Sequence, residues 1–487
     1  MRRLPFLFIV LVLFSCSASK NYNPNKKYSK EELQQDYSLL RHILEKKHPS
    51  LYWYTPKDSM DYYFDQGYKA ITDSMTELQF GWKILAPITS VIHCGHTSFS
   101  MSKGWNKFIK NKRIPSFPLF LKVWKDTMMV TGNLNRNDSA IKPGDFITSI
   151  NGLKSTDMIS LMFDYMAEDG YTENVNYIRL SNSFPYFHRN VFGLYKNYYV
   201  DYTDSNGVEK SALLPYYAPP SDTVKKETKE RKREERKMTH RQKIENIRSL
   251  EYDSSFALMT VNGFSKGHLS HFFRKSFRDL RQQKAEKLII DLRANGGGDI
   301  NKSVLLTKFL RNAPFKVADT AYSISKNFNP YTGRISSGWL NNIVLLFATH
   351  KKKDGNYHFG YWERHFFRVK RKNHFNGNVY ILTNGLTFSA SALFCNAVKD
   401  QPNIILAGEE TGGGWYGNSG IMIPNITLQN TKLKVRLPFF RLVQYHHIAT
   451  KGIGIMPDIY IGPNWRDILN GVDTKLEVVK KMIEDEK

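Results

Sequence analysis

Residues 288–298 read Leu-Ile-Ile-Asp-Leu-Arg-Ala-Asn-Gly-Gly-Gly, an apolar run that stops at a glycine loop. A second stretch, residues 379–391, reads Val-Tyr-Ile-Leu-Thr-Asn-Gly-Leu-Thr-Phe-Ser-Ala-Ser and leads directly into a helical pattern. From residue 256 onward such apolar strands alternate with helices, which predicts an α/β core with a buried parallel sheet. Ligands of these sheets bind beyond the carboxyl ends of the strands, where both loops fall.

Ser389 and the glycine loop are the residues best suited to chemistry in this core. Acyl transfer needs a nucleophile, a base and N–H donors for the oxyanion. Ser389 lies at the start of a helical pattern, where unpaired N–H groups and the positive dipole end favour a developing negative charge. Serine is also a common N-cap, so the local pattern leaves both interpretations open. Gly297 and Gly298 let backbone N–H groups point into a cavity without Cβ interference, which favours the catalytic interpretation.

A small β domain is expected ahead of the core. Residues 141–152 read Ile-Lys-Pro-Gly-Asp-Phe-Ile-Thr-Ser-Ile-Asn-Gly, which predicts a turn, a strand and a hairpin. The segment resembles the PDZ domain, whose members bind extended peptides by adding a strand to a sheet edge. A hairpin in some other small β domain is the alternative. Before it, residues 30–102 have a helical pattern, and Ser29 and Glu32 predict a capping box.

Three motifs together resemble the tail-specific (C-terminal processing) serine peptidases, the family that includes the tricorn core and the retinoid-binding-protein repeats. They are Asp291-Leu-Arg-x-Asn-Gly-Gly-Gly, Ser389-Ala-Ser and Gly408-Glu-x-Thr-Gly-Gly, and a Pro-Asp pair ending at Asp458 resembles the closing segment of the family. The resemblance implies a ClpP/crotonase-like core with a parallel sheet, a PDZ-like β domain and an N-terminal helical segment. It also implies that Ser389 is the nucleophile and that N–H groups of Ala390 and of Gly297 or Gly298 form the oxyanion hole.

The chain departs from this family at the catalytic base. The processing branch uses a lysine after the strand that follows the nucleophile helix, and this chain has glycines there. Lys399 lies about 15 Å along the helix from Ser389, too far to take its proton. The tricorn-like branch uses a histidine followed by threonine ahead of its PDZ domain, and His96-Thr97 matches that pattern. His96 is therefore the expected base, with a helix-end histidine as the alternative.

The orienting carboxylate is less well defined. The tricorn-like branch has a glutamate near the closing Pro-Asp, where this chain has Lys451. Glu409 and Glu410 are candidate substitutes, and we select Glu410 as the catalytic candidate. No motif predicts a cofactor or a metal site, since the pair His268 and His271 lacks a third ligand.

The N-terminus predicts an envelope protein. Met1-Arg2-Arg3 and a short apolar segment precede Leu13-Phe14-Ser15-Cys16, which resembles the bacterial lipobox with Cys16 as the lipidated residue. An ordinary signal peptide with an incidental cysteine is the alternative. We expect anchoring in the outer membrane of a Gram-negative-type bacterium, facing the periplasm. Despite the net charge of +25, this location argues against a nucleic-acid partner. For Cys94 and Cys395, two buried thiols are favoured over a disulfide.

The expected domain order is a signal peptide (1–15), an N-terminal helical region (16–105), a PDZ-like domain (106–218), a charged linker (219–249) and a serine peptidase core (250–487). Residues 320–376 are expected to form a surface insertion in the core, and the linker to be a solvated helix or a binder of anionic lipid. The expected function is a serine-type endopeptidase that hydrolyses exposed or unfolded polypeptides. The alternative is a non-catalytic peptide-binding protein on the same fold. Acyl-CoA chemistry on the related crotonase fold is a third interpretation, which a PDZ domain and a lipid anchor do not favour.

Overall fold

The computed structural model describes residues 22–110, 112, 114–136, 138–219, 240–448 and 450–486. The expected signal peptide, Cys16 and most of the charged linker lie outside these ranges. Within them, no helix combines the length and the apolar character needed to span a bilayer.

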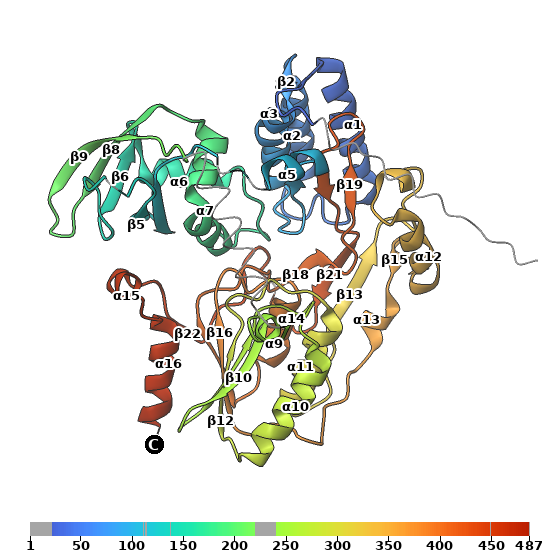
Figure 1. Ribbon diagram of the computed structural model, residues 1–487. Helices are drawn as coiled ribbons and strands as arrows, with labels where there is room; N and C mark the ends of the chain where they lie inside the picture. The colour runs from blue at the N-terminus through green and yellow to red at the C-terminus, as the bar shows by residue number, and fades with distance from the viewer. Residues whose placement is uncertain are drawn as a thin grey trace, which may run out of the picture.

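The N-terminal region is a group of helices with three short strands, at the top of Figure 1. The long helix α1 begins at the predicted capping box, in which Ser29 Oγ accepts from Glu32 N and Glu32 Oε2 accepts from Ser29 N. The elements are β1 (Lys27–Tyr28), α1 (Lys30–Lys47), α2 (Lys57–Lys69), β2 (Met75–Thr76), α3 (Glu77–Phe80), the π-helical turn η1 (Gly81–Leu85), α4 (Ala86–Ser90), β3 (Phe99–Ser100) and α5 (Lys103–Ile109).

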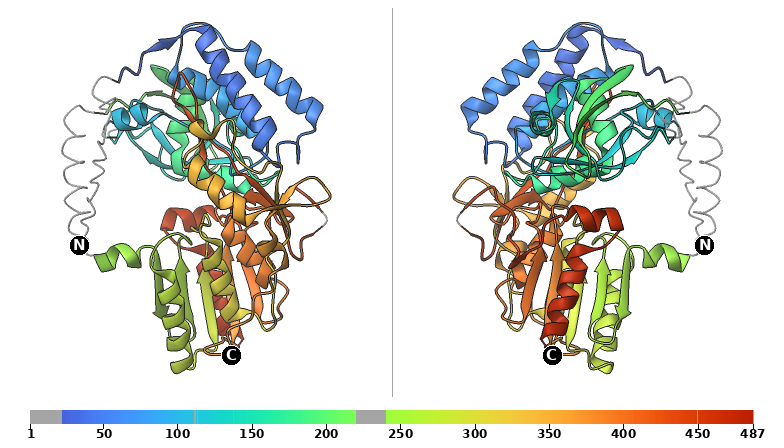
Figure 2. Two further views of the ribbon diagram at one scale, coloured as in Figure 1. Left: turned by 90° about the vertical axis from the view of Figure 1, so that its right-hand side faces the viewer. Right: turned by 90° about the vertical axis from the view of Figure 1, so that its left-hand side faces the viewer.

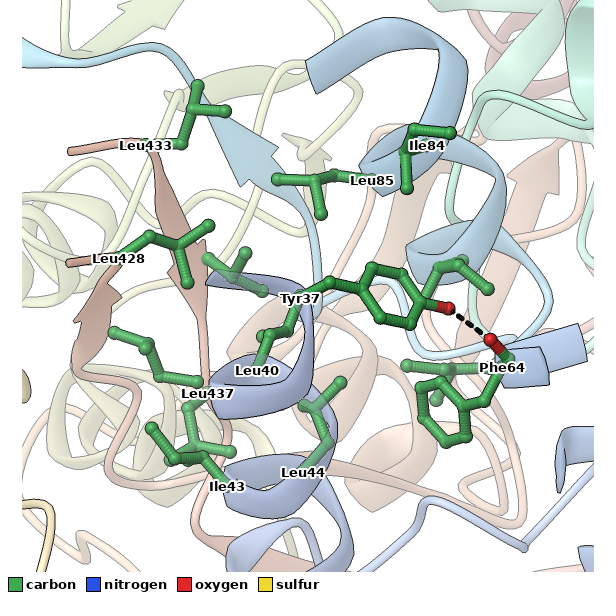
Figure 3. Close-up of a cluster of buried hydrophobic side chains, with 14 of the residues drawn as sticks. Tyr37, Leu40, Ile43, Leu44, Phe64, Ile84, Leu85, Leu428, Leu433 and Leu437 are labelled. Atoms are coloured by element: carbon green, nitrogen blue, oxygen red, sulfur yellow. Dashed lines mark hydrogen bonds between the residues drawn. The ribbon is translucent and has the colours of Figure 1, made fainter. Parts of the chain in front are cut away.

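The core of this region is shared with the C-terminal half of the chain. Apolar side chains of α1 pack against leucines from residues 428–437 (Figure 3). Tyr37 lies fully buried among them and donates from its hydroxyl to the Phe64 carbonyl at 2.8 Å. The buried Asp36 carboxylate accepts from Asn430 N, Thr431 N and Thr431 Oγ1 at 2.7–2.8 Å. Helix α1 is therefore built into the same unit as the core.

A separate β domain follows, with its own buried cluster between residues 117 and 214. Its antiparallel strands run in the order β4-β5-β6-β8-β9, with β7 paired to β6. The predicted hairpin at Asn151-Gly152 connects β6 to β7, and both residues have the positive φ that a tight primed turn requires. The elements are β4 (Leu119–Trp124), β5 (Thr127–Asn133), β6 (Phe146–Ile150), β7 (Leu153–Lys154), α6 (Ser155–Phe163), α7 (Asn174–Phe192), β8 (Asn197–Thr203) and β9 (Glu209–Pro215).

The predicted α/β core is confirmed. Its main sheet has the order β10-β11-β12-β16-β17-β22 and is parallel from β11 onward, with β10 antiparallel at one edge. Alternate strand residues face two helical layers: Ile290 and Ile381 lie in the cluster with α10, α11 and α14, whereas Ile289 and Tyr380 lie in the cluster with α16 (Figure 2). The elements are α9 (His240–Glu245), β10 (Arg248–Tyr252), β11 (Ala257–Val261), α10 (Leu269–Gln282), β12 (Lys287–Asp291), α11 (Ile300–Leu310), β16 (Asn378–Thr383), α14 (Ala390–Val398), β17 (Ile404–Gly408), β22 (Ile459–Tyr460), α15 (Trp465–Asn470) and α16 (Thr474–Asp485).

Residues 320–376 are more than a surface insertion. Strand β13 pairs with β21 in a second sheet of order β14-β15-β13-β21-β18, and Phe328 and Leu345 from this segment are fully buried. A small third sheet, β19-β20-β3, joins the core to the N-terminal region. The elements are β13 (Ala318–Ser323), η2 (Thr332–Arg334), α12 (Gly338–Ala348), β14 (His350–Lys351), β15 (Tyr357–His358), α13 (Gly360–Arg364), β18 (Gly417–Gly420), β19 (Asn425–Thr427), β20 (Lys434–Arg436) and β21 (Phe440–Gln444).

Candidate active site

Ser389 lies at a sharp turn between β16 and α14. Its backbone has φ 55° and ψ −120°, a conformation that costs a non-glycine residue free energy and that recurs where a nucleophile must be presented at a helix start. Thr387 donates a hydrogen bond from its hydroxyl to the Leu292 carbonyl at 3.1 Å. This bond connects the turn to the end of β12. Ser389 occupies the N-cap position of α14, but its side chain makes no capping hydrogen bond to the helix, so the hydroxyl is available.

His96 is brought to Ser389 across 293 residues of sequence. Its Nε2 lies 3.0 Å from Ser389 Oγ, the distance of a hydrogen bond that can carry a proton. The imidazole is buried and packs on the ring of Phe388, with ring centroids 4.8 Å apart. Burial, with a further contribution from the positive charge of Arg436, lowers the pKa of His96 to about 3. The ring is therefore neutral near pH 7.

The loop that carries His96 is fixed on both sides by buried polar groups. Asp169 Oδ1 accepts from Gly95 N at 2.8 Å, and His48 Nε2 lies 2.8 Å from Thr97 Oγ1. Asp169 is fully buried, and this burial raises the pKa of its carboxyl to about 7. His93, the other histidine of this loop, bonds to Glu168 Oε1 at 2.9 Å instead of to the serine.

The glycine loop lies directly against the nucleophile. A Cβ on Gly297 would come within 2.7 Å of Ser389 Cβ and 2.9 Å of Ala390 N, so only glycine fits there. The Gly297 N–H already donates to Asn295 Oδ1 at 3.0 Å, which makes it a poor oxyanion donor. In the described part of the chain, the N–H groups of Gly298 and Ala390 have no acceptor. Of the expected donors, the structure thus favours Gly298 and Ala390 over Gly297.

The structure does not bring Glu410 to His96. Its Oε1 accepts from Gly454 N at 2.6 Å, because residues 410–411 pack against the closing segment around Gly454. The neighbouring Glu409 forms an ion pair with Lys475 at 2.8 Å. The buried Nδ1 of His96 has no hydrogen-bond partner among the described residues, so no carboxylate orients the imidazole there.

Two further expectations about the site are decided by the structure. Lys399 bonds to Asp458, consistent with its expected distance from the nucleophile. Cys94 and Cys395 are buried free thiols, as predicted. No sequence motif indicates Asp169, whose contact with Gly95 spans 74 residues of the chain.

The fold and the site together define a serine peptidase, with a serine on a strained strand-to-helix turn beside unpaired N–H groups. Residues 255–461, which make up most of the core, match the model of the peptidase family S41. No curated protein matches the chain.

Solved structures match nearly the whole chain. The structure of mature CPAF complexed with lactacystin has a TM-score of 0.63 at 14% identity, covering 93% of this chain and 98% of that one. A second structure of mature CPAF has the same TM-score and identity and is covered to 97%. The photosystem II D1 C-terminal processing protease gives a TM-score of 0.41 at 13% identity, covering 91% of this chain and 98% of that one. At such identities, the likeness to CPAF establishes the fold alone.

Proposed function

We propose that this serine peptidase hydrolyses peptide bonds in exposed or unfolded polypeptides, with Ser389 as nucleophile and His96 as general base. The observation that carries the proposal is the 3.0 Å contact between His96 Nε2 and Ser389 Oγ. A serine hydroxyl is a weak nucleophile until an adjacent base takes its proton, and this contact supplies such a base.

The chemistry follows from the positions of these groups. Ser389 Oγ attacks the scissile carbonyl carbon while its proton passes to His96 Nε2. The oxyanion of the tetrahedral intermediate accepts hydrogen bonds from Gly298 N and Ala390 N. His96 then gives the proton to the leaving amine, and water hydrolyses the acyl-enzyme with the same base. Because His96 is neutral before substrate binds, it can accept the proton throughout the neutral range.

This catalytic unit is a Ser–His dyad within the described residues. In serine peptidases with a triad, a carboxylate on the second ring nitrogen orients the imidazole and stabilises its charged form. Here the packing of Phe388 against the ring and the anchoring of the loop by Asp169 fix the orientation instead.

We further propose that the PDZ-like domain captures the substrate. Adding a peptide strand requires a free sheet edge. The edge of β4 is covered by α7, since the Ser181 hydroxyl bonds to both the N–H and the carbonyl of Val123. Strand β9 at the opposite edge pairs with β8 and with no other strand of the described chain, so β9 is the edge that we propose to bind polypeptide.

The proposed location is the bacterial cell envelope, through a lipid on Cys16. This rests on the lipobox-like sequence around Cys16, which also carries the expectation of a Gram-negative-type outer membrane facing the periplasm. We expect Cys16→Ala to shift the protein from the membrane fraction to the soluble fraction of lysed cells.

The activity is tested with casein as an unfolded substrate. We expect Ser389→Ala to abolish casein hydrolysis and Ser391→Ala to retain it. Ser391 is the matched control because it is the same residue type two positions further along the chain, buried and without a hydrogen-bond partner among the described residues. Equal hydrolysis by wild type and Ser389→Ala would remove Ser389 from the mechanism. No hydrolysis by folded wild type would favour the non-catalytic peptide-binding alternative, which the unpartnered Nδ1 of His96 also motivates.

A further inference from the structure

A cavity of about 440 Å³ adjoins the segment that carries His96. Gly95 and Ser98, on either side of His96-Thr97, contribute to its lining. A Cβ on Gly95 would lie 2.6 Å from the ring of Phe388, the residue before Ser389. The side of the cavity formed by Gly95 is therefore in contact with the turn that carries Ser389. The cavity is therefore next to the proposed catalytic dyad.

Two arginines from distant segments line this cavity. Arg179 comes from α7 and Arg436 from the end of β20. The backbone N–H of Arg436 donates to the Ser98 carbonyl at 3.0 Å, which holds β20 against the His96 loop. In the described chain, neither guanidinium has a carboxylate within ion-pair distance, and Arg179 Nη1 donates only to neutral acceptors, the Ala167 carbonyl and Asn176 Oδ1. The cavity thus holds two cations without a direct anionic partner.

Two carboxylates, Glu168 and Asp169, act on Arg179 through their charge without an ion pair to it in the described chain. Glu168 bonds to His93 Nδ1 at 2.9 Å and to Asn176 Nδ2 at 2.7 Å, and Asp169 accepts from Gly95 N. Burial lowers the pKa of Arg179; the fields of Glu168 and Asp169 oppose this effect, and the positive charge of Arg436 adds to it. An anion placed between the two guanidinium groups would reduce their mutual repulsion.

We propose that this cavity is a subsite for a carboxylate of the polypeptide substrate, held by Arg179 and Arg436. Arginine presents a planar fork of donors that matches a carboxylate, and the aromatic side chains of Trp82, Tyr165 and Phe187 on the cavity wall can pack against the carbon atoms that carry it. The carboxylate can belong to an aspartate or glutamate side chain or to the C-terminus of the peptide. The inference rests on the proposed function, since it assigns a substrate preference to the same site.

The test measures binding instead of turnover. Rhodamine-labelled heptapeptides of alanine are bound to the Ser389→Ala protein, and Kd is measured by fluorescence anisotropy. One peptide has a central glutamate and an amidated C-terminus, a second replaces that glutamate with glutamine, and a third is the glutamine peptide with a free C-terminal carboxylate. We expect at least one carboxylate peptide to bind about tenfold more tightly than the neutral one, the gain typical of a charge-assisted hydrogen bond. Which of the two binds more tightly identifies the source of the carboxylate.

Variants of Arg436 assign the preference to this cavity. Arg436 is chosen because it is exposed, so Arg436→Gln is expected to fold. In the Ser389→Ala background, Arg436→Gln should reduce the preference to less than about twofold, and Arg436→Lys should restore part of it. Arg189→Gln, on the same helix α7 but lining a different cavity, should leave the preference unchanged.

Two outcomes would overturn the inference: equal Kd for all three peptides, or a carboxylate preference that Arg436→Gln leaves intact. Neither outcome bears on the hydrolysis of casein by the wild type. Conversely, loss of the proposed peptidase activity would leave this binding experiment interpretable, because it uses a protein without the Ser389 hydroxyl.

Discussion

His96 is kept neutral by its surroundings, and this has consequences for how reactivity depends on pH. Its pKa of about 3 lies well below the ordinary value near 6.5, because the buried ring loses solvent and lies in the field of Arg436. A base with a depressed pKa loses its function only when the pH falls toward that depressed value. Protonation of His96 should therefore not limit the site between pH 5 and pH 7.

The pH dependence of fluorophosphonate labelling tests this. We expect the second-order rate of labelling of the wild type to fall with acid only below about pH 5, well under the ordinary histidine value near 6.5. Circular dichroism at each pH confirms that the protein is folded. A midpoint between pH 6 and pH 7 would show that His96 titrates as an ordinary histidine.

At the scale of the elements, the active site depends on how closely the loop after β12 approaches the start of α14. Gly297 has φ +95°, and its Cα lies where any Cβ would contact Ser389 and Ala390 N. Gly296, one residue earlier, has open space around its Cβ position. An alanine at each position therefore distinguishes a steric clash with the Ser389 turn from the effect of any substitution in this loop.

We expect Gly297→Ala to lower the initial rate of casein hydrolysis by about 100-fold, because a shift of about 1 Å at the reacting groups costs that much. Gly296→Ala should retain activity within about twofold. Comparable activity of the two variants would mean that the approach of this loop to Ser389 is not needed for catalysis.

For the whole molecule, the N-terminal helices and the core form one folded unit. Asp36 on α1 is buried and accepts three hydrogen bonds from Asn430 and Thr431, almost 400 residues away in sequence. This contact positions the N-terminal region, whose continuation carries His96, against the part of the chain that carries Ser389. The stability of the folded protein and the assembly of the active site should therefore be linked.

Asp36→Ala should lower the free energy of unfolding by about 3–5 kcal/mol, because two buried donors and one partly buried donor lose their acceptor. Urea denaturation followed by circular dichroism measures this. The exposed Asp58 on α2 provides the control, and Asp58→Ala should change the free energy of unfolding by less than about 1 kcal/mol. Equal losses in the two variants would contradict the structural role of Asp36.

Much of the core fold could be predicted from sequence, because its signals are local. The apolar runs of β12 and β16, followed by glycine and by a helical pattern, predicted the parallel sheet and the placing of Ser389 at its edge. His96 was selected from a two-residue motif, and its contact with Ser389 required the structure.

The remaining features of the site depend on contacts between segments that are far apart in sequence. Asp169 holds Gly95 through a side chain that no motif marks, and Arg436 reaches the same region on a strand of only three residues. The position of Glu410 in the sequence makes it a candidate, but the direction of its side chain is set by its hydrogen bond to the backbone of Gly454. Side-chain direction within a loop follows from tertiary packing, which spacing along the chain does not reveal.

The central claim is that Ser389 is a nucleophile activated by His96, and covalent labelling tests it most directly. The wild type, His96→Ala and Ser391→Ala proteins are treated with a fluorophosphonate, and the modified residue is located by mass spectrometry. We predict labelling at Ser389 in the wild type and in Ser391→Ala, and its loss in His96→Ala. Absence of label on Ser389 in the folded wild type, or undiminished labelling in His96→Ala, would contradict the account.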